Sequence, residues 1–338
     1  MRVLIDPTLS SQLLAERVAI VTGGSRGIGG ATATMLAANG ARVMVSDVDE
    51  AEGTQMVADL NEAFGTGAAE VFAADLVAPG TCEQLITYTL DTYGGLDIVV
   101  NNAGYAWDSR VHAMSDEEFQ AMLDIHLIVP FRLARACAPV FQAAAEADDV
   151  ARTPRHHKTV MVSSMAAQWG LDGGANYAAA KAGLLGLMRS LAVEWGTLRV
   201  NVNAVSFGVV QTRFGLPQSD REVIHTGGRE IKVGMPAKQA RRMGVVVDPR
   251  RSPSDAEIYA PKHFSGAALS RTGTIREAAD AIFWLCSPLS DYTTGQVIAV
   301  NGGAQGGLAA AAHPNPHQHQ EDPWSNATRR RSTRFYSR

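Results

Sequence analysis

Tyr177 and Lys181 are the residues of this chain whose types and spacing point most directly to chemistry. They lie four positions apart in the apolar stretch NYAAAKAGLLGLMRSLAVEWG, which predicts a helix over 176–196, so their side chains share one face about one turn apart. A phenol is a poor acid–base catalyst at neutral pH, and a neighbouring ammonium favours the phenolate; lowering its pKa by about 3 units takes roughly 4 kcal/mol. Tyr177 is therefore a candidate general acid–base residue. The plainer alternative is a surface Tyr and Lys on an amphipathic helix.

A second candidate feature is the glycine-rich sequence TGGSRGIG, residues 22–29, between a predicted strand and a predicted helix. Gly23 permits a tight turn, while Gly27 and Gly29 allow a pyrophosphate to approach the backbone at the helix N-terminus. The spacing is G-x-x-x-G-x-G rather than the common G-x-G-x-x-G, so the loop by itself is weak evidence. Asp47, at the end of the next strand, strengthens it as an acceptor for the ribose hydroxyls of a bound NAD.

Two details leave the nature of the dinucleotide open. Asp47 could instead cap the helix that begins in SDVDEAEG, and the loop residue Arg26 could meet the 2′-phosphate of NADP. An acid at position 47 repels that phosphate. We therefore expect NAD(H) as the cofactor, with NADP(H) as the alternative.

The elements that must position these residues alternate along the chain. Short β-branched runs predict buried parallel strands separated by helical stretches, an order that indicates a sheet covered on both faces. The strands are expected at 17–24, 41–47, 69–75, 96–104, 158–164, 198–208 and 295–303. We predict one doubly wound α/β domain over 1–303, a parallel Rossmann-type sheet of about seven strands. The tail 304–338 has the composition of a disordered segment.

Bulk composition narrows the classes of partner and compartment. The chain is 46% hydrophobic and 19% charged with a net charge of −4, which gives no reason to expect nucleic acid or an anionic membrane surface. Its three cysteines are far apart and have no metal-ligand spacing. With no signal peptide and no apolar run of about 18 residues, we expect a cytoplasmic protein without a resident metal. The tail sequences HPNPHQHQ and RRRSTR could bind a metal or an anion, but a solvated tail is the simpler interpretation.

Four motifs taken in order resemble the short-chain dehydrogenase/reductase family. They are TGGSRGIG, NNAG at 101–104, Ser164 and YAAAK at 177–181, and the resemblance runs from about residue 15 to 303. The segment GANYAAAKAGLLGL is most similar to 3-oxoacyl thioester reductase-like members of that family. The resemblance implies an NAD(P)(H)-dependent interconversion of a ketone and a secondary alcohol. In that reaction Tyr177 exchanges the proton, Ser164 hydrogen-bonds the reacting carbonyl, and Lys181 also binds the nicotinamide ribose.

The resemblance further implies a set of cofactor-binding positions along the carboxyl edge of the sheet. They are Gly23, Ser25, Arg26, Gly27, Ile28, Gly29, Asp47, Asp75, Leu76, Asn102, Ala103, Gly104, Tyr177, Lys181, Gly208, Val210 and Thr212. Asp75 resembles the adenine contact of the family, and Thr212 resembles the group that holds the nicotinamide carboxamide. Phe207-Gly208 stands where the family has Pro-Gly, a change that could alter the nicotinamide pocket slightly.

His126 is the departure from the family pattern. It falls where the family has an asparagine whose helix position offers a backbone carbonyl to a water in a proton relay beside the lysine. A main-chain carbonyl does not depend on the side chain, so the site could keep its activity. An imidazole titrates near neutrality and could also join the relay or change the pH profile. The remaining alternative is an impaired, cofactor-binding regulatory protein.

Residues 209–274 lack a βαβ pattern and are predicted to form an enlarged insertion over the substrate. Its arginines, Arg241, Arg242, Arg250 and Arg251, could meet the phosphate of a phosphopantetheine or coenzyme A, or could be a solvated face. The helix at 176–196 is apolar on nearly all sides, so we expect a homodimer or homotetramer that covers it. An extended-type epimerase or dehydratase would suit the chain length, but such enzymes usually carry G-x-x-G-x-x-G.

Overall fold

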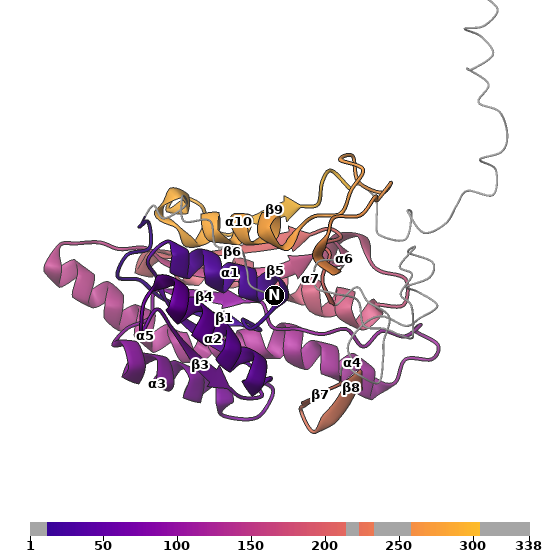
Figure 1. The fold of residues 1–338 in the computed structure, drawn as a ribbon, viewed down its shortest axis with the longest axis horizontal. Helices are drawn as coiled ribbons and strands as arrows, with labels where there is room; N and C mark the ends of the chain where they lie inside the picture. Colours follow the sequence, from indigo (N-terminus) through magenta and orange to yellow (C-terminus); the bar gives the residue numbers. More distant parts are fainter. Residues whose placement is uncertain (1–11, 214–222, 233–257, 305–338) are drawn as a thin grey trace, which may run out of the picture.

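A parallel seven-stranded sheet forms the centre of the computed structural model, which describes residues 12–213, 223–232 and 258–304 (Figure 1). The strand order is β3-β2-β1-β4-β5-β6-β9, and every neighbouring pair is parallel. The strands are β1 Val18–Thr22, β2 Arg42–Asp47, β3 Ala69–Ala73, β4 Ile98–Asn101, β5 His157–Ser164, β6 Val200–Phe207 and β9 Val297–Val300. The chain order reverses between β1 and β4, where doubly wound sheets bind their ligands. The predicted fold class is confirmed.

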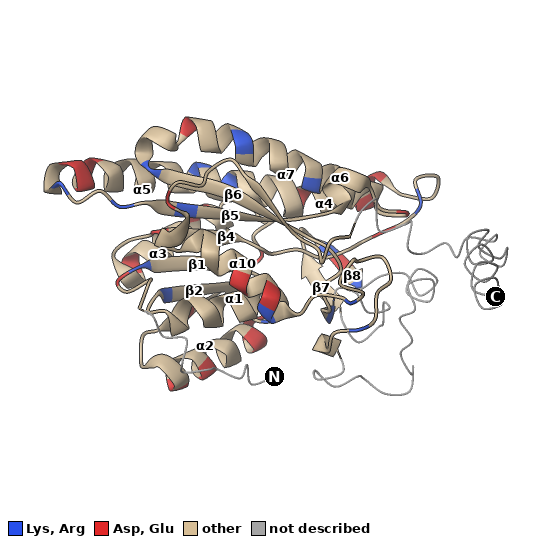
Figure 2. Ribbon diagram, turned by 90° about the horizontal axis from the view of Figure 1, so that it is seen from above, with Lys and Arg blue, Asp and Glu red and all other residues tan. Residues whose placement is uncertain are grey.

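Helices cover the sheet on both faces, as the alternation of the sequence requires. They are α1 Gly27–Ala38, α2 Glu50–Phe64, α3 Thr81–Tyr93, α4 Asp116–Leu123, α5 Val129–Ala151, α6 Ala166–Trp169, α7 Ala175–Glu194 and α10 Ile275–Cys286. Figure 2 shows α5 and α7 on one side of the sheet and α1 and α2 on the other.

Alternate residues of each strand supply the two apolar cores. Ile20 of β1 packs in the core that includes residues of α3, α5 and α7, while Ala19 and Val21 pack in the core with α1, α2 and α10. Because a side chain period of two is fixed by the pleat, a shift of one residue in pairing would exchange these two cores.

A π-helical turn, Asp124–Ile128, joins α4 to α5 in one continuous helical stretch. By length and mean hydropathy, Asp116–Ala151 is long and apolar enough to cross a membrane, the one such helix in the described part of the chain. From the sequence we expected no apolar run of about 18 residues, and that statement holds only for runs that no polar residue interrupts. Met122, Leu133 and Phe141 on this stretch are fully buried in the core beside the sheet.

The insertion is described in two parts. The antiparallel hairpin of β7 Val223–Thr226 and β8 Arg229–Lys232 packs beside the sheet rather than within it. The second part, 258–273, places Phe264 and Ala267 against Met165, directly after Ser164. The expected tail from 305 onward and the arginines at 241, 242, 250 and 251 lie outside the described residues.

Candidate active site

The glycine loop has the backbone that a close phosphate approach requires. Gly23 and Gly27 have φ of +60° and +59°, and a Cβ on Gly29 would stand 2.0 Å from the Gly23 carbonyl oxygen. A Cβ on Gly27, by contrast, would meet nothing within 4 Å, so the first turn of α1 faces open space. The Asn102 side chain braces this loop by donating to the carbonyls of Thr22 at 2.8 Å and Gly23 at 3.1 Å. The residues present therefore fit a pyrophosphate at the N-terminus of α1.

Asp47 lies beside the glycine loop at the end of β2. Its carboxylate accepts hydrogen bonds from the backbone N–H of Ser25 at 3.2 Å and from the Ser25 hydroxyl. The N-cap of α2 is Asp49, which accepts from Glu52 N at 3.2 Å, so the alternative role of Asp47 as that cap is wrong. The guanidinium of Arg26 lies 3.4 Å from the Asp49 carboxylate. The carboxylates of Asp47 and Asp49 therefore lie near the end of β2, and Arg26 is paired with the second of them.

Asp75 is held by the hairpin as well as by its own loop. Its carboxylate accepts hydrogen bonds from Val77 N at 3.0 Å, from the Thr226 hydroxyl at 2.7 Å and from Gly227 N at 2.6 Å. Leu76 beside it is 5% exposed. The structure thus brings part of the insertion to the position that resembles the adenine contact, where no sequence signal places it.

At the carboxyl end of β6, Gly208 is tightly packed. Its N–H donates to the Val300 carbonyl at 3.1 Å, and an added Cβ would stand 2.9 Å from Asn301 Cα. Val210 bridges to Gly273 and packs with Ile28 of α1 in one small apolar cluster. Thr212 lies in the bend that follows.

Ser164, Tyr177 and Lys181 meet where β5 ends and α7 begins. The hydroxyls of Ser164 and Tyr177 are hydrogen-bonded, and Ser164 also accepts from Ala166 N at 3.2 Å. Lys181 Nζ lies 5.7 Å from the centroid of the Tyr177 ring and donates to the Val162 carbonyl at 2.6 Å. The predicted trio is thus brought together.

The first turn of α7 is fixed from outside the helix. Asn176, whose side chain is fully buried, donates to the carbonyls of Trp107 and Glu118, at 3.0 Å in both cases. A bridge between Ser109 and Gly174 ties the loop after β4 to the residue that precedes α7. These contacts orient the neighbouring Tyr177.

Burial dominates the ionisation of both central groups. It raises the pKa of Tyr177 to about 12, against the lowering effect of the Ser164 hydrogen bond, and the Asp108 charge raises it further. Burial likewise lowers the pKa of Lys181 to about 7. The expectation that Lys181 lowers the pKa of the phenol is therefore not met in this structure. The ammonium is directed to a backbone carbonyl, and its own burial disfavours its charge.

His126 lies within the π turn and faces the site. Its Nε2 donates to the Tyr105 carbonyl at 2.8 Å, its ring stands edge-on to Tyr177, and Nδ1 is buried without a described partner. Burial and then the Lys181 charge lower its pKa well below the ordinary value. The idea that this imidazole titrates near neutrality is therefore wrong for this structure, and the ring is neutral at pH 7.

Gly104 explains how an imidazole fits at this position. An added Cβ on Gly104 would stand 2.3 Å from Cε1 and 2.8 Å from Nδ1 of His126. The glycine therefore leaves the space that the ring fills. A π turn also shifts the helical hydrogen bonds by one residue and is frequent at functional sites.

Asp108 is a site residue that the sequence interpretation missed. It is 7% exposed, its Oδ1 has no described hydrogen-bond partner, and burial raises its pKa to about 7. Its position four residues after NNAG was the only available signal, since burial of a loop carboxyl is not readable from the sequence. Among the described residues no cluster of His, Cys, Asp or Glu is arranged to hold a metal.

Comparisons with known proteins agree with this geometry. The sequence model of the short chain dehydrogenases matches residues 17–222, and the one described as enoyl-(acyl carrier protein) reductase matches residues 250–305. The 3-oxoacyl-(acyl-carrier-protein) reductase FabG of Escherichia coli (strain K12) is 32% identical over 85% of this chain and 96% of its own length. The short-chain reductase protein NovJ of Streptomyces niveus is 30% identical over 88% and 97%.

A solved structure has the same fold. A dehydrogenase/reductase from Sinorhizobium meliloti 1021 aligns with a TM-score of 0.67 and 26% identity, covering 88% of this chain and 98% of that one. Together with the Ser164, Tyr177 and Lys181 site and the glycine loop, these matches show that the chain belongs to the short-chain dehydrogenase/reductase family and is an NAD(P)-dependent oxidoreductase acting on ketones and secondary alcohols.

Proposed function

We propose that the protein is an NAD(H)-dependent reductase of 3-oxoacyl thioesters. The observation that carries the catalytic part is the hydrogen-bonded pair of Ser164 and Tyr177 beside Lys181. The reductases among its relatives, FabG above all, support the substrate class. The arginines expected to meet a phosphopantetheine or coenzyme A phosphate remain a prediction.

Each member of the trio has a distinct role in this proposal. A nicotinamide held by Lys181 and the glycine loop would supply the hydride for the ketone carbon. Tyr177, kept protonated by burial, donates its proton to the ketone oxygen as the carbonyl π electrons move onto it, and Ser164 donates a second hydrogen bond to that oxygen. Lys181 holds the nicotinamide ribose and faces the phenol ring. In the reverse direction the Tyr177 phenolate removes the hydroxyl proton.

The preference for NAD(H) rests on the charges at the edge of the adenosine site. The carboxylates of Asp47 and Asp49 lie at the end of β2, where we propose that the adenosine ribose binds, and Arg26 faces Asp49. Two acids repel a phosphate that one shared arginine does not compensate. Steady-state reduction of acetoacetyl thioesters and simple ketones, with NADH and NADPH compared, tests both parts. A preference for NADPH would refute the cofactor assignment, and an inactive thioester beside an active simple ketone would refute the substrate class.

Assembly is part of the same proposal. Phe131 and Val150 of α5 and Val193 of α7 are 44%, 88% and 85% exposed in the single chain, on two helices along the same side of the sheet (Figure 2). We expect a homodimer or homotetramer in the cytoplasm that covers these residues. Light scattering coupled to size-exclusion chromatography measures the state, and a monomer at micromolar concentration would contradict it.

A further inference from the structure

The β7–β8 hairpin has one inward face and one outward face. Ile224 pairs with Ile231, and Thr226 pairs with Arg229, so these four side chains share a face. Ile231 is fully buried in the core that includes Leu76 and Val77. His225 and Glu230, opposite each other on the other face, are exposed. The hairpin therefore packs in one defined register.

Polar contacts fix the hairpin to two parts of the active site. At its turn, Thr226 and Gly227 hold the carboxylate of Asp75, and the Thr226 hydroxyl is also hydrogen-bonded to Tyr105. The backbone carbonyl of Tyr105 in turn accepts from His126.

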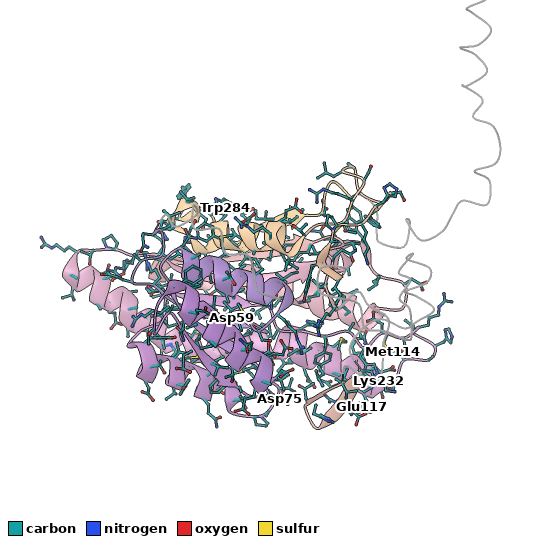
Figure 3. All side chains as sticks on the ribbon, in the orientation of Figure 1. Asp59, Asp75, Met114, Glu117, Lys232 and Trp284 are labelled. Atoms are coloured by element: carbon teal, nitrogen blue, oxygen red, sulfur yellow. The ribbon has the colours of Figure 1, made fainter. Side chains whose placement is uncertain are left out.

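The second strand makes the other contact. Arg229 lies 2.9 Å from Asp124 of the π turn and 3.7 Å from Glu117, with side chains of Arg229 and Asp124 18% and 19% exposed. Asp75, Glu117 and Lys232, labelled in Figure 3, mark this region of the molecule.

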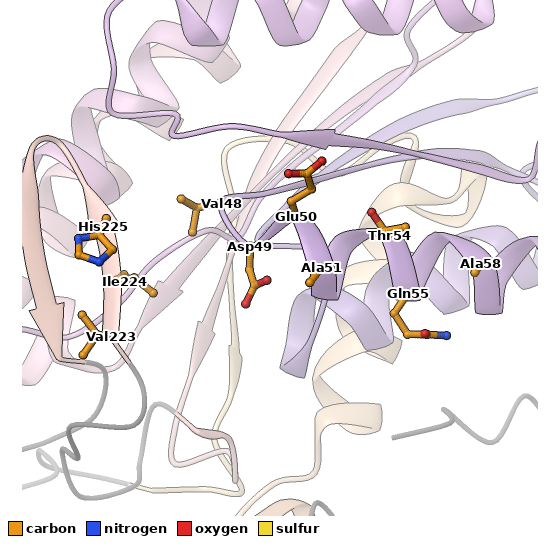
Figure 4. Close-up of a pocket in the computed structure, with 10 residues that line it drawn as sticks. All are labelled: Val48, Asp49, Glu50, Ala51, Thr54, Gln55, Ala58, Val223, Ile224 and His225. Atoms are coloured by element: carbon orange, nitrogen blue, oxygen red, sulfur yellow. The ribbon is translucent and has the colours of Figure 1, made fainter.

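A cavity of about 720 Å³ separates the hairpin from the start of α2. One wall consists of Val48, Asp49 and the first turns of α2, and the other of Val223, Ile224 and His225 (Figure 4). Val48 follows Asp47 directly, and the hairpin turn next to His225 holds Asp75. The cavity is thus lined by a neighbour of each acid assigned to the adenosine half of the cofactor, Val48 beside Asp47 and His225 beside the turn that holds Asp75. Its size is within the range of small-molecule sites.

We propose that the β7–β8 hairpin is the outer wall of the adenosine subsite, with His225 of its outward face packing against the adenine ring opposite Val48. This rests on the proposed roles of Asp47 and Asp75 in holding the dinucleotide. An imidazole ring offers a flat contact to a purine, and such stacking contacts tolerate a wide range of bases. The part of the insertion at 223–232 therefore serves the cofactor, not the acyl substrate.

This wall also couples the two ends of the site. Asp75 accepts hydrogen bonds from the hairpin at both of its oxygens, so an adenine amino group that binds Asp75 shares it with Thr226 and Gly227. Arg229 links the same hairpin to the π turn that carries His126. The hairpin contacts Asp75 directly but reaches the nicotinamide end only through Arg229 and Asp124. A change at His225 or Thr226, which leaves Arg229 in place, is therefore expected to affect the binding of the adenosine half more than that of the nicotinamide half.

Fluorescence titration with NADH and with reduced nicotinamide mononucleotide, which lacks the adenosine half, separates these effects. His225→Ala is expected to raise the Kd for NADH about 5- to 10-fold. Thr226→Val, which removes the hydroxyl bond to Asp75, is expected to raise it at least 3-fold. Both variants should bind the mononucleotide within 2-fold of the unchanged protein. Glu230→Gln, an exposed change opposite His225 that does not line the cavity, is the matched control and should leave both values unchanged.

The inference is overturned if His225→Ala leaves the Kd for NADH within 2-fold, or if it weakens the mononucleotide equally. Thermal unfolding of each variant identifies a loss of folding by Thr226→Val. If Thr226→Val does not fold, the two Kd values of His225→Ala, a change at an exposed position, test the inference without it. Because the readout is binding, failure of the proposed thioester reduction leaves this test intact. NADH binding that depends on the hairpin would support the inference in a protein that reduces no thioester.

Discussion

The imidazole of His126 stands edge-on to the phenol ring of Tyr177, with centroids 5.1 Å apart and planes at 86°. This places the residue that departs from the family pattern in direct contact with the proposed acid–base group. The ring is neutral, since Nε2 carries the proton donated to Tyr105 and burial disfavours the charged form. His126 therefore acts as packing against Tyr177 and not as a titrating member of the relay.

His126→Asn tests that interpretation through the pH dependence of kcat. A neutral imidazole does not ionise between pH 6 and 9, so the variant and the unchanged enzyme are expected to share one profile over that range. Rates at each pH should agree within about 5-fold, because only a packing contact changes. An ionisation near pH 6.5 that is present in the unchanged enzyme and missing in the variant would contradict a neutral His126. Activity gained about 100-fold or more in the variant would instead favour an impaired natural enzyme.

Gly104 and His126 are predicted to be energetically coupled. Gly104→Ala places a Cβ 2.3 Å from the imidazole and should lower the free energy of unfolding by about 1–3 kcal/mol. In a His126→Ala background the obstructing ring is gone, and the same change should cost less than about 1 kcal/mol. Urea unfolding of the four proteins measures the cycle. Equal costs in the two backgrounds would show that Gly104 is required for another reason.

Asp108 is predicted to destabilise the fold once it ionises. Its pKa is about 7 in the folded chain against an ordinary value of 3.8, so the folded state binds more protons between those values and stability falls as the pH rises through that window. Asp108→Asn removes the ionisable group and with it this pH-dependent loss of stability. The variant is expected to be more stable than the unchanged protein by about 1–3 kcal/mol at pH 8 and to show little difference at pH 4. A stability difference that does not change between these two pH values would refute the shifted pKa.

Lys181 is predicted to lower the stability of the fold while it supports catalysis. Its pKa of about 7 against 10.5 means that the folded state gives up a proton that the unfolded chain retains. Stability therefore increases with pH from 7 to 10.5, and at pH 7 and below the buried charge is at its most costly. Lys181→Met should raise the free energy of unfolding by about 1–3 kcal/mol at pH 7 and reduce kcat/KM by about 100-fold or more. A variant that is both less stable and fully active would contradict this account.

Much of the fold was readable because a doubly wound sheet leaves periodic signals. The strand β1 is a short apolar run, rich in β-branched residues, that is followed by glycines. Tyr177 and Lys181 show their relationship through helical spacing. The positions of the glycine loop, Ser164, Tyr177 and Lys181 relative to one another follow from the carboxyl edge that parallel strands share.

Other features depend on burial and on long-range contacts, which no local pattern encodes. The direction of the Tyr177 pKa shift could not be predicted because spacing shows the nearby ammonium but not the depth of both groups. The docking of Thr226 on Asp75 joins positions 151 residues apart in sequence. The π turn at 124–128 and the unpartnered carboxyl oxygen of Asp108 likewise depend on packing that the sequence alone does not show.

The central claim is that Tyr177 transfers the proton in an NADH-dependent ketone reduction. Its most direct measurement is the absorbance at 340 nm for the unchanged enzyme and Tyr177→Phe, with NADH and whichever acetoacetyl thioester or simple ketone the unchanged enzyme reduces fastest. Phenylalanine keeps the ring beside His126 and removes only the hydroxyl, so NADH binding should persist while kcat falls by about 1,000-fold or more. A Tyr177→Phe variant that reduces the ketone within 10-fold of the unchanged rate would contradict the account.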